Sequence, residues 1–408
     1  MHLYDLPLVL ALIGLAFYTV LAGADFGAGF WQLIAGKGGQ ADEIRDHAYH
    51  AMAPVWEANH VWLIFVLTVV WTAYPIAFGS IASTLSIPLF IAGIGIVLRG
   101  GAYALRAGTA TTREQRSLDS LFAVSSILTP FALGTVIGAL ASEQVHVGNP
   151  GGSLVTSWLN PTSITIGVLA VTSSAYLAAV FLSGDAAREG RHALADRFRA
   201  RALAAGLAAG AVAMAGLIVL HFDAERIFRR LTEGAGLPAL VVSLTAGIAT
   251  LLLVWHRRYE PARYTAALAV AATIAGWAVA QNPVFLQGLT VRQAAAGHDV
   301  LVAVVVATLV GALLLFPALA LLFRLTLGGE LRSGEHGSRE SPVRPHRRQR
   351  LGVRLDARLA VAFLVAGIGF LTIANGAWAH GIGVACFFGF ILSGYQVALP
   401  EDIADAGN

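Results

Sequence analysis

Long apolar runs recur along this chain, and they constrain its fold more than any other feature. Examples are residues 76–98, 202–220 and 300–323. A helix of about 20 apolar residues spans the hydrocarbon core of a bilayer. Inside lipid, every backbone N–H and C=O needs a partner within the protein, and a helix supplies one for each. The runs therefore predict an all-α fold, a polytopic transmembrane helical bundle.

Composition supports this class. Charged residues make up 12% and hydrophobic residues 57% of the 408 positions, whereas soluble globular chains carry about 25% charged residues. The net charge of +3 does not indicate nucleic acid, because the arginines lie between the apolar runs, where they act as a topology signal. The single cysteine, Cys386, permits no internal disulfide.

The first apolar run, residues 7–31, is predicted to remain as a membrane helix. It is too long for a signal peptide and lacks the basic n-region and the small-residue cleavage site. About nine membrane helices are expected in total, at residues 7–31, 51–73, 76–98, 119–141, 162–183, 202–221, 238–256, 264–281 and 299–323.

The chain divides by composition into four parts. Residues 1–327 form the predicted bundle, and residues 328–357 form a polar linker rich in Gly, Ser, Pro and Arg. Residues 358–398 are apolar and predict an extra transmembrane helix or a hairpin, because Gly376 and Gly381 favour a turn near the middle. Residues 399–408 are a polar tail.

Basic residues alternate between the predicted loops. The alternate loops 142–161, 222–237 and 282–298 hold only four arginines. Loops after the first, third, fifth and seventh predicted helices hold many more: Lys37, Arg45, Arg99, Arg106, Arg113, Arg116, Arg188, Arg191, Arg197, Arg199, Arg201, Arg257, Arg258 and Arg263. By the positive-inside rule, the N-terminus lies outside and the linker 328–357 is cytoplasmic.

Asp25 is the first candidate for chemistry, because an ionisable group inside a membrane is costly. It lies in Gly23-Ala24-Asp25-Phe26-Gly27-Ala28-Gly29, near the predicted cytoplasmic end of the first helix. Gly23, Gly27 and Gly29 are candidate packing residues, because small residues let helices approach closely. Asp25 is either a carboxylate on a proton path or an interfacial residue beside a packing motif.

A second cluster, Pro54-Val55-Trp56-Glu57-Ala58-Asn59-His60-Val61-Trp62, opens the second predicted helix. Glu57 and His60 are three residues apart and share a helix face, so they are candidates for a proton relay. The alternative is that the helix dipole favours Glu57 in the first turn, while Trp56 and Trp62 anchor the helix at the membrane interface. The amide of Asn59 can link two helices.

Arg99 and Arg106 follow the third predicted helix, on the same side of the membrane as these carboxylates. They are candidate counter-charges, or else part of the topology signal alone. For haem, the histidines offer no pair at matching depth on facing helices. The cysteine and histidine spacings of zinc and iron–sulfur sites are absent too. No metal site is therefore expected on this chain.

These clusters resemble signatures of subunit II of the cytochrome bd-type quinol oxidases. Residues 23–29 resemble the Asp-Gly-Phe-Asp-Leu-Gly-Val-Gly signature, and residues 54–64 resemble Pro-Val-Trp-Asp-Gly-Asn-Glu-Val-Trp-Leu-Ile. Residues 99–106 resemble the arginine-bounded segment after the family's third helix. The resemblance covers about residues 1–325, in the family's order.

Three positions depart from the family pattern. Ala22 stands where the signature has its first aspartate, Glu57 replaces the aspartate of the second signature, and Ala58 replaces the glycine that follows it. These changes put the course of a proton path in doubt. The region after residue 328 extends beyond the usual subunit.

The resemblance implies a non-haem subunit of a membrane complex that oxidises quinol and reduces oxygen to water. Subunit I of such a complex carries haem b and haem d, so no catalytic residue is expected on this chain. The implied roles here are to support assembly of subunit I, to help deliver cytoplasmic protons, and to hold a quinone. A small accessory subunit is a further implied partner.

Two other functions stay open. Intramembrane carboxylates also suit a proton-coupled secondary transporter, although Pro88 and Pro317 interrupt apolar runs without an evident repeat. A membrane scaffold would use the glycine-rich face for packing alone.

Overall fold

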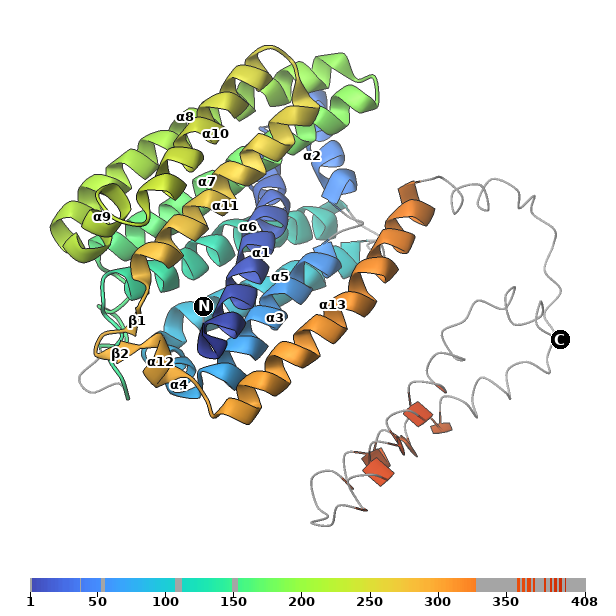
Figure 1. Ribbon diagram of the computed structural model, residues 1–408. Helices are drawn as coiled ribbons and strands as arrows, with labels where there is room; N and C mark the ends of the chain where they lie inside the picture. Colours follow the sequence, from blue (N-terminus) through green and yellow to red (C-terminus); the bar gives the residue numbers. More distant parts are fainter. Residues whose placement is uncertain are drawn as a thin grey trace. The chain divides into compact units, whose positions relative to one another are not determined.

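The computed structural model describes residues 2–36, 38–52, 56–106, 112–148 and 153–327, and scattered positions between 358 and 393. Cα packing divides the chain into two units, Met1–Phe316 and Pro317–Asn408. The first unit is a bundle of long helices (Figure 1).

Among the described residues, eight helices are long and apolar enough to cross a membrane, and the number is nine if a bent pair of helices counts as one span. The pair is α3 (Trp56–Ala73) and α4 (Pro75–Thr84), bent by 119°. This agrees with the expected all-α multi-pass bundle of about nine helices. The other crossings are α1 (Leu6–Leu33), α5 (Ser86–Arg106), α6 (Thr112–Ala141), α7 (Pro161–Arg188), α8 (His192–Asp223), α10 (Leu237–Trp255), α11 (Tyr259–Gln281) and α13 (His298–Leu327).

Short elements close the two ends of the bundle. The helix α2 (Gly39–Met52) joins α1 to α3. At the opposite end are η1 (Leu3–Asp5), α9 (Glu225–Thr232), α12 (Val291–Ala294) and an antiparallel hairpin of β1 (Val284–Leu286) and β2 (Leu289–Thr290).

Contacts between loops identify which loops share an end. The Tyr74 hydroxyl donates to Tyr4 O (2.6 Å) and accepts from Leu8 N (3.0 Å), so the N-terminus lies beside the α3–α4 junction. At the other end, Arg263 pairs with Asp185 (2.5 Å), which joins the start of α11 to the end of α7. The arginine-rich loops thus lie together at one end, as nine crossings require. Which compartment each end faces stays a prediction.

The bounds predicted for the third helix, 76–98, were wrong. The structure breaks it between Thr84 and Ser86 and extends the second part to Arg106. Pro88 explains the break, because a proline has no N–H to donate and its ring clashes with the carbonyl four residues earlier. That carbonyl belongs to Thr84, the last residue of α4. Arg99 and Arg106 therefore lie within α5 rather than after a helix.

Two helical segments were missed because they are polar. Residues 39–52 form α2, although the sequence analysis treated them as part of a loop, and α8 begins at His192 rather than near residue 202. Hydropathy marks the part of a helix that crosses lipid, and it does not mark a helix end in the interface or in water. The helical spacing of Ala41, Ile44 and Ala48, which are buried in the structure, was a signal in the sequence for α2.

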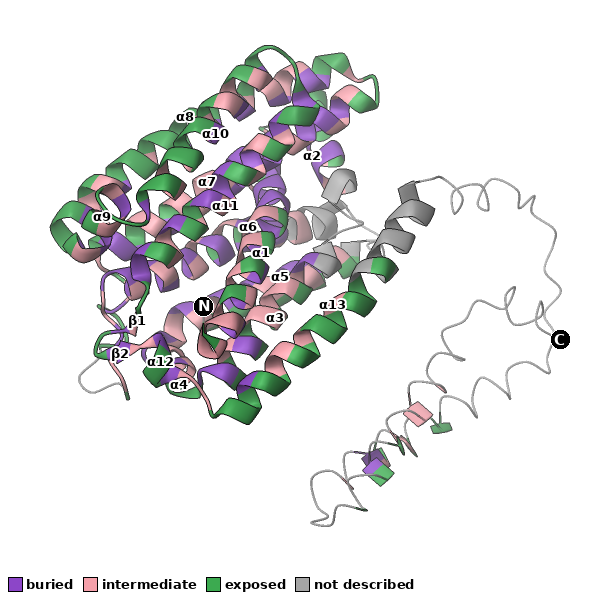
Figure 2. Cartoon of the chain, viewed as in Figure 1, coloured by how far each residue is buried: buried purple, intermediate pink, exposed green. Residues whose placement is uncertain are grey.

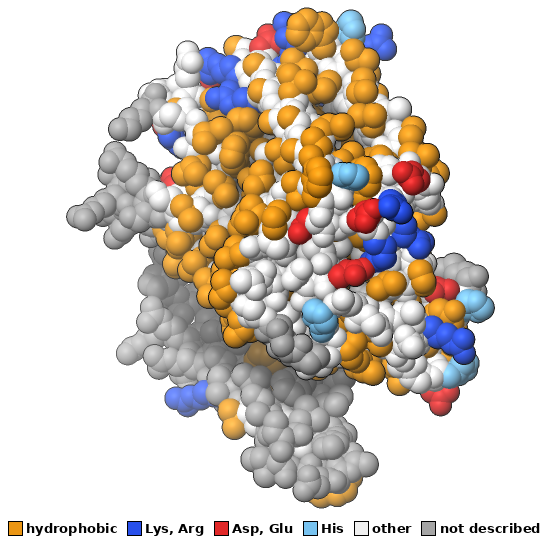
Figure 3. Space-filling view, turned by 90° about the vertical axis from the view of Figure 1, so that its left-hand side faces the viewer, with side chains coloured by type: hydrophobic (Ala, Val, Ile, Leu, Met, Phe, Trp, Pro, Cys, Tyr) orange, Lys and Arg blue, Asp and Glu red, His pale blue; other side chains and the backbone are white. Residues whose placement is uncertain are grey.

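The main core cluster is rich in alanine, with larger side chains such as Trp31 and Phe198 among the alanines. This cluster joins α1, α2, α7, α8 and α11 around Ala24, Ala28 and residues 175–180. In Figure 2, buried residues line the inner sides of α1, α7 and α11, and exposed residues cover the outer sides of α8, α10 and α13. Figure 3 shows a broad hydrophobic surface beside a patch where charged side chains gather, as expected for a membrane protein.

In the second unit, described positions between 358 and 393 are helical. A Cβ added at Gly389 would lie 3.0 Å from the Phe363 ring, so residues near the two ends of this segment are in contact. The extra helix or hairpin at 358–398 stays a prediction. The linker 328–357 and the tail 399–408 lie outside the described residues.

Candidate functional site

Asp25 lies in the interior of the bundle, on a helix that packs against at least five others. α1 contacts α2, α3, α6, α7 and α11. The apolar composition of α1 and the proline in its first turn favour a continuous helix. Asp25 is 1% exposed, eight residues before the end of this helix. The carboxylate is therefore buried inside the protein.

Arg99 from α5 is its partner. Arg99 Nη2 donates to Asp25 Oδ1 (2.5 Å) and to the Asp25 backbone carbonyl (2.9 Å). Arg99 Nη1 donates to Ser126 Oγ on α6 (3.0 Å). The guanidinium carbon lies 4.7 Å from the centre of the Phe26 ring and 4.4 Å from that of Phe122. The ion pair thus ties α1, α5 and α6 together between two aromatic rings.

Such a pair is costly to bury, and its stability depends on both partners being present. Arg99 is 1% exposed, like Asp25. Asp25 Oδ2 and Arg99 Nε have no hydrogen-bond partner among the described atoms. A carboxylate with one paired oxygen and one open oxygen is able to accept a proton from water or from a neighbouring group. The site therefore combines the positive charge of Arg99 with a carboxylate oxygen, Asp25 Oδ2, that has no partner among the described atoms.

His60 from α3 approaches the same region. Its ring meets the edges of Tyr18 (6.3 Å) and Phe26 (6.4 Å), and it interacts electrostatically with Asp25. The structure thus brings Asp25, His60 and Arg99 together. Their role in proton transfer stays a prediction.

The neighbours of His60 hold α3 against α1. The Asn59 amide donates to Leu21 O (3.3 Å), which links the two helices, and Trp62 stacks on Phe17 (4.8 Å). Trp56 and Glu57 lie in the first turn of α3 and Arg106 ends α5. The side chains of these three lie outside the described residues.

The candidate packing glycines face different neighbours. A Cβ at Gly27 would lie 1.9 Å from the Ser174 carbonyl oxygen of α7, and one at Gly29 would lie 2.5 Å from Ser126 Cβ of α6. Gly23 has looser contact, 3.3 Å from the Leu177 side chain. Gly27 and Gly29 therefore let α1 lie directly against two helices at once.

Sequence reasoning missed Ser126 and Tyr18. Ser126 donates to Phe122 O (2.6 Å) while it accepts from Arg99. Tyr18 is 4% exposed and its hydroxyl has no partner among the described atoms. Tyr18 and Asp25 are seven residues apart, two helical turns, so they share a face of α1. The seven-residue spacing in the sequence was therefore a signal that Tyr18 lies on the same helix face as Asp25.

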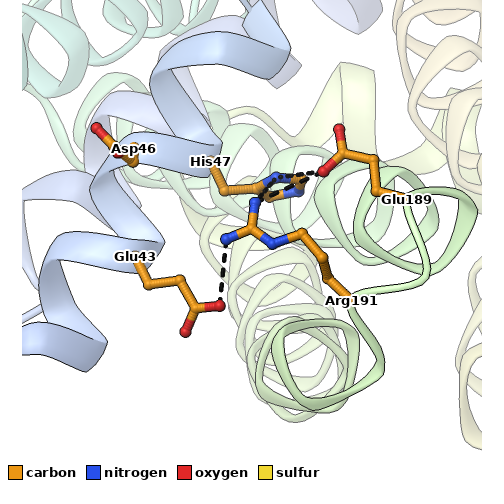
Figure 4. A pocket seen from close by; sticks show the side chains of 5 residues that line it. All are labelled: Glu43, Asp46, His47, Glu189 and Arg191. Carbon is orange, nitrogen blue, oxygen red and sulfur yellow. Dashed lines mark hydrogen bonds and ion pairs between the residues drawn. The ribbon is translucent and has the colours of Figure 1, made fainter.

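A second polar cluster lies at the arginine-rich end of the bundle. Figure 4 shows Glu43 and His47 of α2 facing Glu189 and Arg191 of the α7–α8 connection, with Asp46 pointing away from them. These five residues line a cavity of about 490 Å³. His47 is 3% exposed. Nothing in the sequence analysis singled out this cluster, because α2 itself was missed.

Metal ligation was tested on the described residues. Within them, no three His, Cys, Asp or Glu side chains converge as a metal site would require.

The chain matches one family model over most of its length. The model described as cytochrome bd terminal oxidase subunit II matches residues 3–326. A solved structure, the bd oxidase from Geobacillus thermodenitrificans, has a chain with a TM-score of 0.61 and 24% identity. The match covers 80% of this chain and 99% of that one. At this identity the likeness shows the fold alone.

Curated relatives match a shorter stretch. The cytochrome bd ubiquinol oxidase subunit 2 of Bacillus subtilis is 26% identical over 174 residues, 41% of this chain and 48% of the relative. The cytochrome bd-I ubiquinol oxidase subunit 2 of Escherichia coli K12 is 25% identical over 161 residues, 38% of this chain and 41% of the relative. The matched part spans about half the length of these relatives or less.

Proposed function

The chain belongs to the cytochrome bd terminal oxidase subunit II family, and we propose that it serves as the haem-free subunit of a membrane quinol oxidase. In this role it partners a haem-bearing subunit I that carries haem b and haem d. The complex oxidises quinol and reduces oxygen to water. The relatives are named as ubiquinol oxidase subunits, which supports the proposal.

The observation that carries the proposal is the buried Asp25–Arg99 pair with His60 beside it. Formation of water from oxygen takes up protons, and low-dielectric protein conducts them only through titratable groups or water. A carboxylate with an open oxygen inside the bundle suits this task. We assign Asp25, Glu57 and His60 to cytoplasmic proton delivery and Arg99 to the counter-charge. Arg106 is a second candidate counter-charge.

Assembly is the second part of the proposed role. Gly27 and Gly29 allow α1 to pack closely against α7 and α6. This close packing would hold in place the helices that a partner subunit contacts. A quinone and a small accessory subunit are further proposed partners, on the strength of the family alone. The N-terminus outside and the arginine-rich end in the cytoplasm complete the proposed arrangement.

A proton-coupled transporter is the alternative, since a buried carboxylate beside an arginine also suits proton-coupled transport. Co-purification separates the two functions. We expect a tagged chain to bring down a haem-bearing subunit with quinol oxidase activity, whereas the chain expressed alone should show no stoichiometric haem spectrum. A Soret band at one haem per isolated chain would contradict the haem-free role. Substrate uptake by the chain alone would favour the transporter.

A further inference from the structure

The short helix α9 joins α8 to α10 at the same end of the bundle as the β1–β2 hairpin (Figure 1). Three crossings end or begin beside it, since α8 ends at Asp223, α10 begins at Leu237 and α11 ends at Gln281. Phe222 and Leu237, on either side of α9, are large apolar residues with exposed side chains. α9 therefore lies at the level where the crossings leave the hydrocarbon, which is where lipid headgroups lie.

α9 and α11 lie antiparallel, and two contacts define how they are matched. Arg226 Nη1 donates to Gln281 O (3.4 Å). A Cβ added at Gly276 would lie 3.4 Å from Leu231 Cδ2. The chain thus advances along α9 from Arg226 to Leu231 while it runs back along α11 from Gln281 to Gly276. Both helices rise by about 1.5 Å per residue, so the positions between these contacts are matched as well.

This match places Arg230 opposite Trp277, and both side chains carry a buried N–H without a partner. Arg230 Nε and Trp277 Nε1 have no hydrogen bond within the described part of the chain. The same is true of Arg226 Nη2 and of both polar atoms of the Gln281 amide, and Gln281 is 7% exposed. Four of these five atoms are N–H donors. Buried polar groups are almost always hydrogen-bonded, so this set indicates an acceptor that the chain does not supply.

Arg230 also has a positive charge that no carboxylate of the described residues neutralises in an ion pair. The other two arginines of α9 differ in this respect, because Arg226 pairs with Glu143 and Arg229 pairs with Glu225. Arg230 is half-buried, so part of its side chain reaches the surface. The charge of Arg230 is therefore available to a ligand.

The start of α10 adds to the positive potential beside Arg230. Gly236, the residue before α10, donates its N–H to Arg230 O (2.9 Å), and the N-terminus of a helix has a partial positive charge. Glu233 lies between them in sequence, but it is exposed and pairs with none of the described cations. The acceptor that suits this position is therefore an anion.

We propose that Arg230 and Trp277 bind the phosphate group of a membrane phospholipid at the contact between α9 and α11. A guanidinium presents a planar fork of donors that matches a phosphate, and the indole N–H adds a donor from the second helix. Tryptophan is also a residue of the membrane interface. Phe222 and Leu237 offer apolar surface for the acyl chains, which favours a lipid over a phosphate ion from water. The proposal does not depend on the proposed function.

The test measures lipid binding to the purified full-length chain, together with its co-purified partner, after delipidation in detergent. The probe is dioleoyl phosphatidylglycerol, followed by native mass spectrometry, and dioleoylglycerol is the matched lipid without phosphate. Arg230→Gln should weaken the tightest binding of phosphatidylglycerol by about tenfold or more, because a hydrogen bond to a charged group contributes about this factor. Trp277→Phe keeps an aromatic ring without the N–H and should weaken binding by a smaller factor.

Arg229→Gln is the matched control. It makes the same change of charge on the same helix, but Arg229 is 66% exposed and already paired with Glu225, so binding should stay at the wild-type level. The thermal midpoint with and without phosphatidylglycerol is the second measurement, in case Arg230→Gln is recovered poorly. Arg230→Lys keeps the charge and should retain part of the rise that the lipid causes.

Four results would overturn the proposal. Equal weakening in Arg230→Gln and Arg229→Gln would mean attraction by charge alone, and equal binding of dioleoylglycerol would mean that the acyl chains suffice. Full displacement of the lipid by inorganic phosphate at equal concentration would assign the site to the free ion. Loss of the partner from Arg230→Gln with unchanged lipid binding would make the site a contact between proteins.

Discussion

Asp25 and Arg99, 74 residues apart, form an ion pair of 2.5 Å inside the membrane bundle, and each is 1% exposed. The guanidinium is also held by Ser126 and lies between two phenylalanine rings. The pair therefore has a structural role in joining three helices, whatever it does with protons. The two roles can be separated by substitution.

Asp25→Asn should destabilise the complex, because it leaves Arg99 buried without a counter-charge. Breaking such a pair costs about 3–5 kcal/mol, whereas replacing both members with apolar residues is often neutral. Asp25→Asn should thus lower the haem content of membranes. The double variant Asp25→Leu with Arg99→Met should recover haem content but not turnover. Recovery of turnover in the double variant would remove Asp25 from the proton path.

Glu57→Gln tests the second carboxylate. Glutamine keeps the shape and the hydrogen bonding of the side chain but does not ionise, so haem content should stay near normal. Turnover should fall by about 100-fold or more if the carboxylate transfers protons. Glu57→Asp is the matched control and should retain part of the activity. A collapse of haem content in Glu57→Gln would instead identify Glu57 as structural.

Gly27→Leu should separate α1 from α7. A Cβ at this position already lies 1.9 Å from the Ser174 carbonyl oxygen, and overpacking of this kind costs about 1–3 kcal/mol or more. We expect a lower thermal midpoint of the purified complex and less haem in membranes. Gly210→Leu on α8 is the control, because a Cβ there meets nothing within 4 Å. Equal stability of the two variants would contradict the packing role.

Reporter fusions test the orientation of the bundle. Fusions after residues 110, 190 and 340 should report the cytoplasm, and fusions near residues 150 and 290 should report the outside. The reason is the gathering of arginines at one end, which the positive-inside rule places in the cytoplasm. The reverse pattern would place the N-terminus inside and the Asp25–Arg99 pair near the opposite compartment.

The membrane crossings were predictable from sequence because each must present about 20 apolar residues to lipid. α2 was not, since it does not cross and its described buried residues are only Ala41, Ile44, His47 and Ala48. The break at Leu85 follows from Pro88 by local geometry, so that one residue was a sufficient signal for it.

The site was predictable only in its parts. Asp25, His60 and Arg99 stood out as ionisable groups in or beside apolar runs, but their meeting depends on the packing of three helices. Ser126 gave no signal, because a serine in a membrane helix is able to bond its own backbone, as Ser126 does with Phe122 O. The glycines indicated close contact without indicating which helix each would touch.

The distance in sequence between Asp25 and Arg99 has a consequence for biogenesis. Chain synthesis proceeds at about 5–20 residues per second, so Asp25 is made roughly 4–15 s before Arg99. During this interval the carboxylate lacks its counter-charge and has to be accommodated by water, a proton or the insertion machinery. Stable insertion of α1 into lipid then depends on the insertion of α5, so mutations that delay α5 would first impair the insertion of α1.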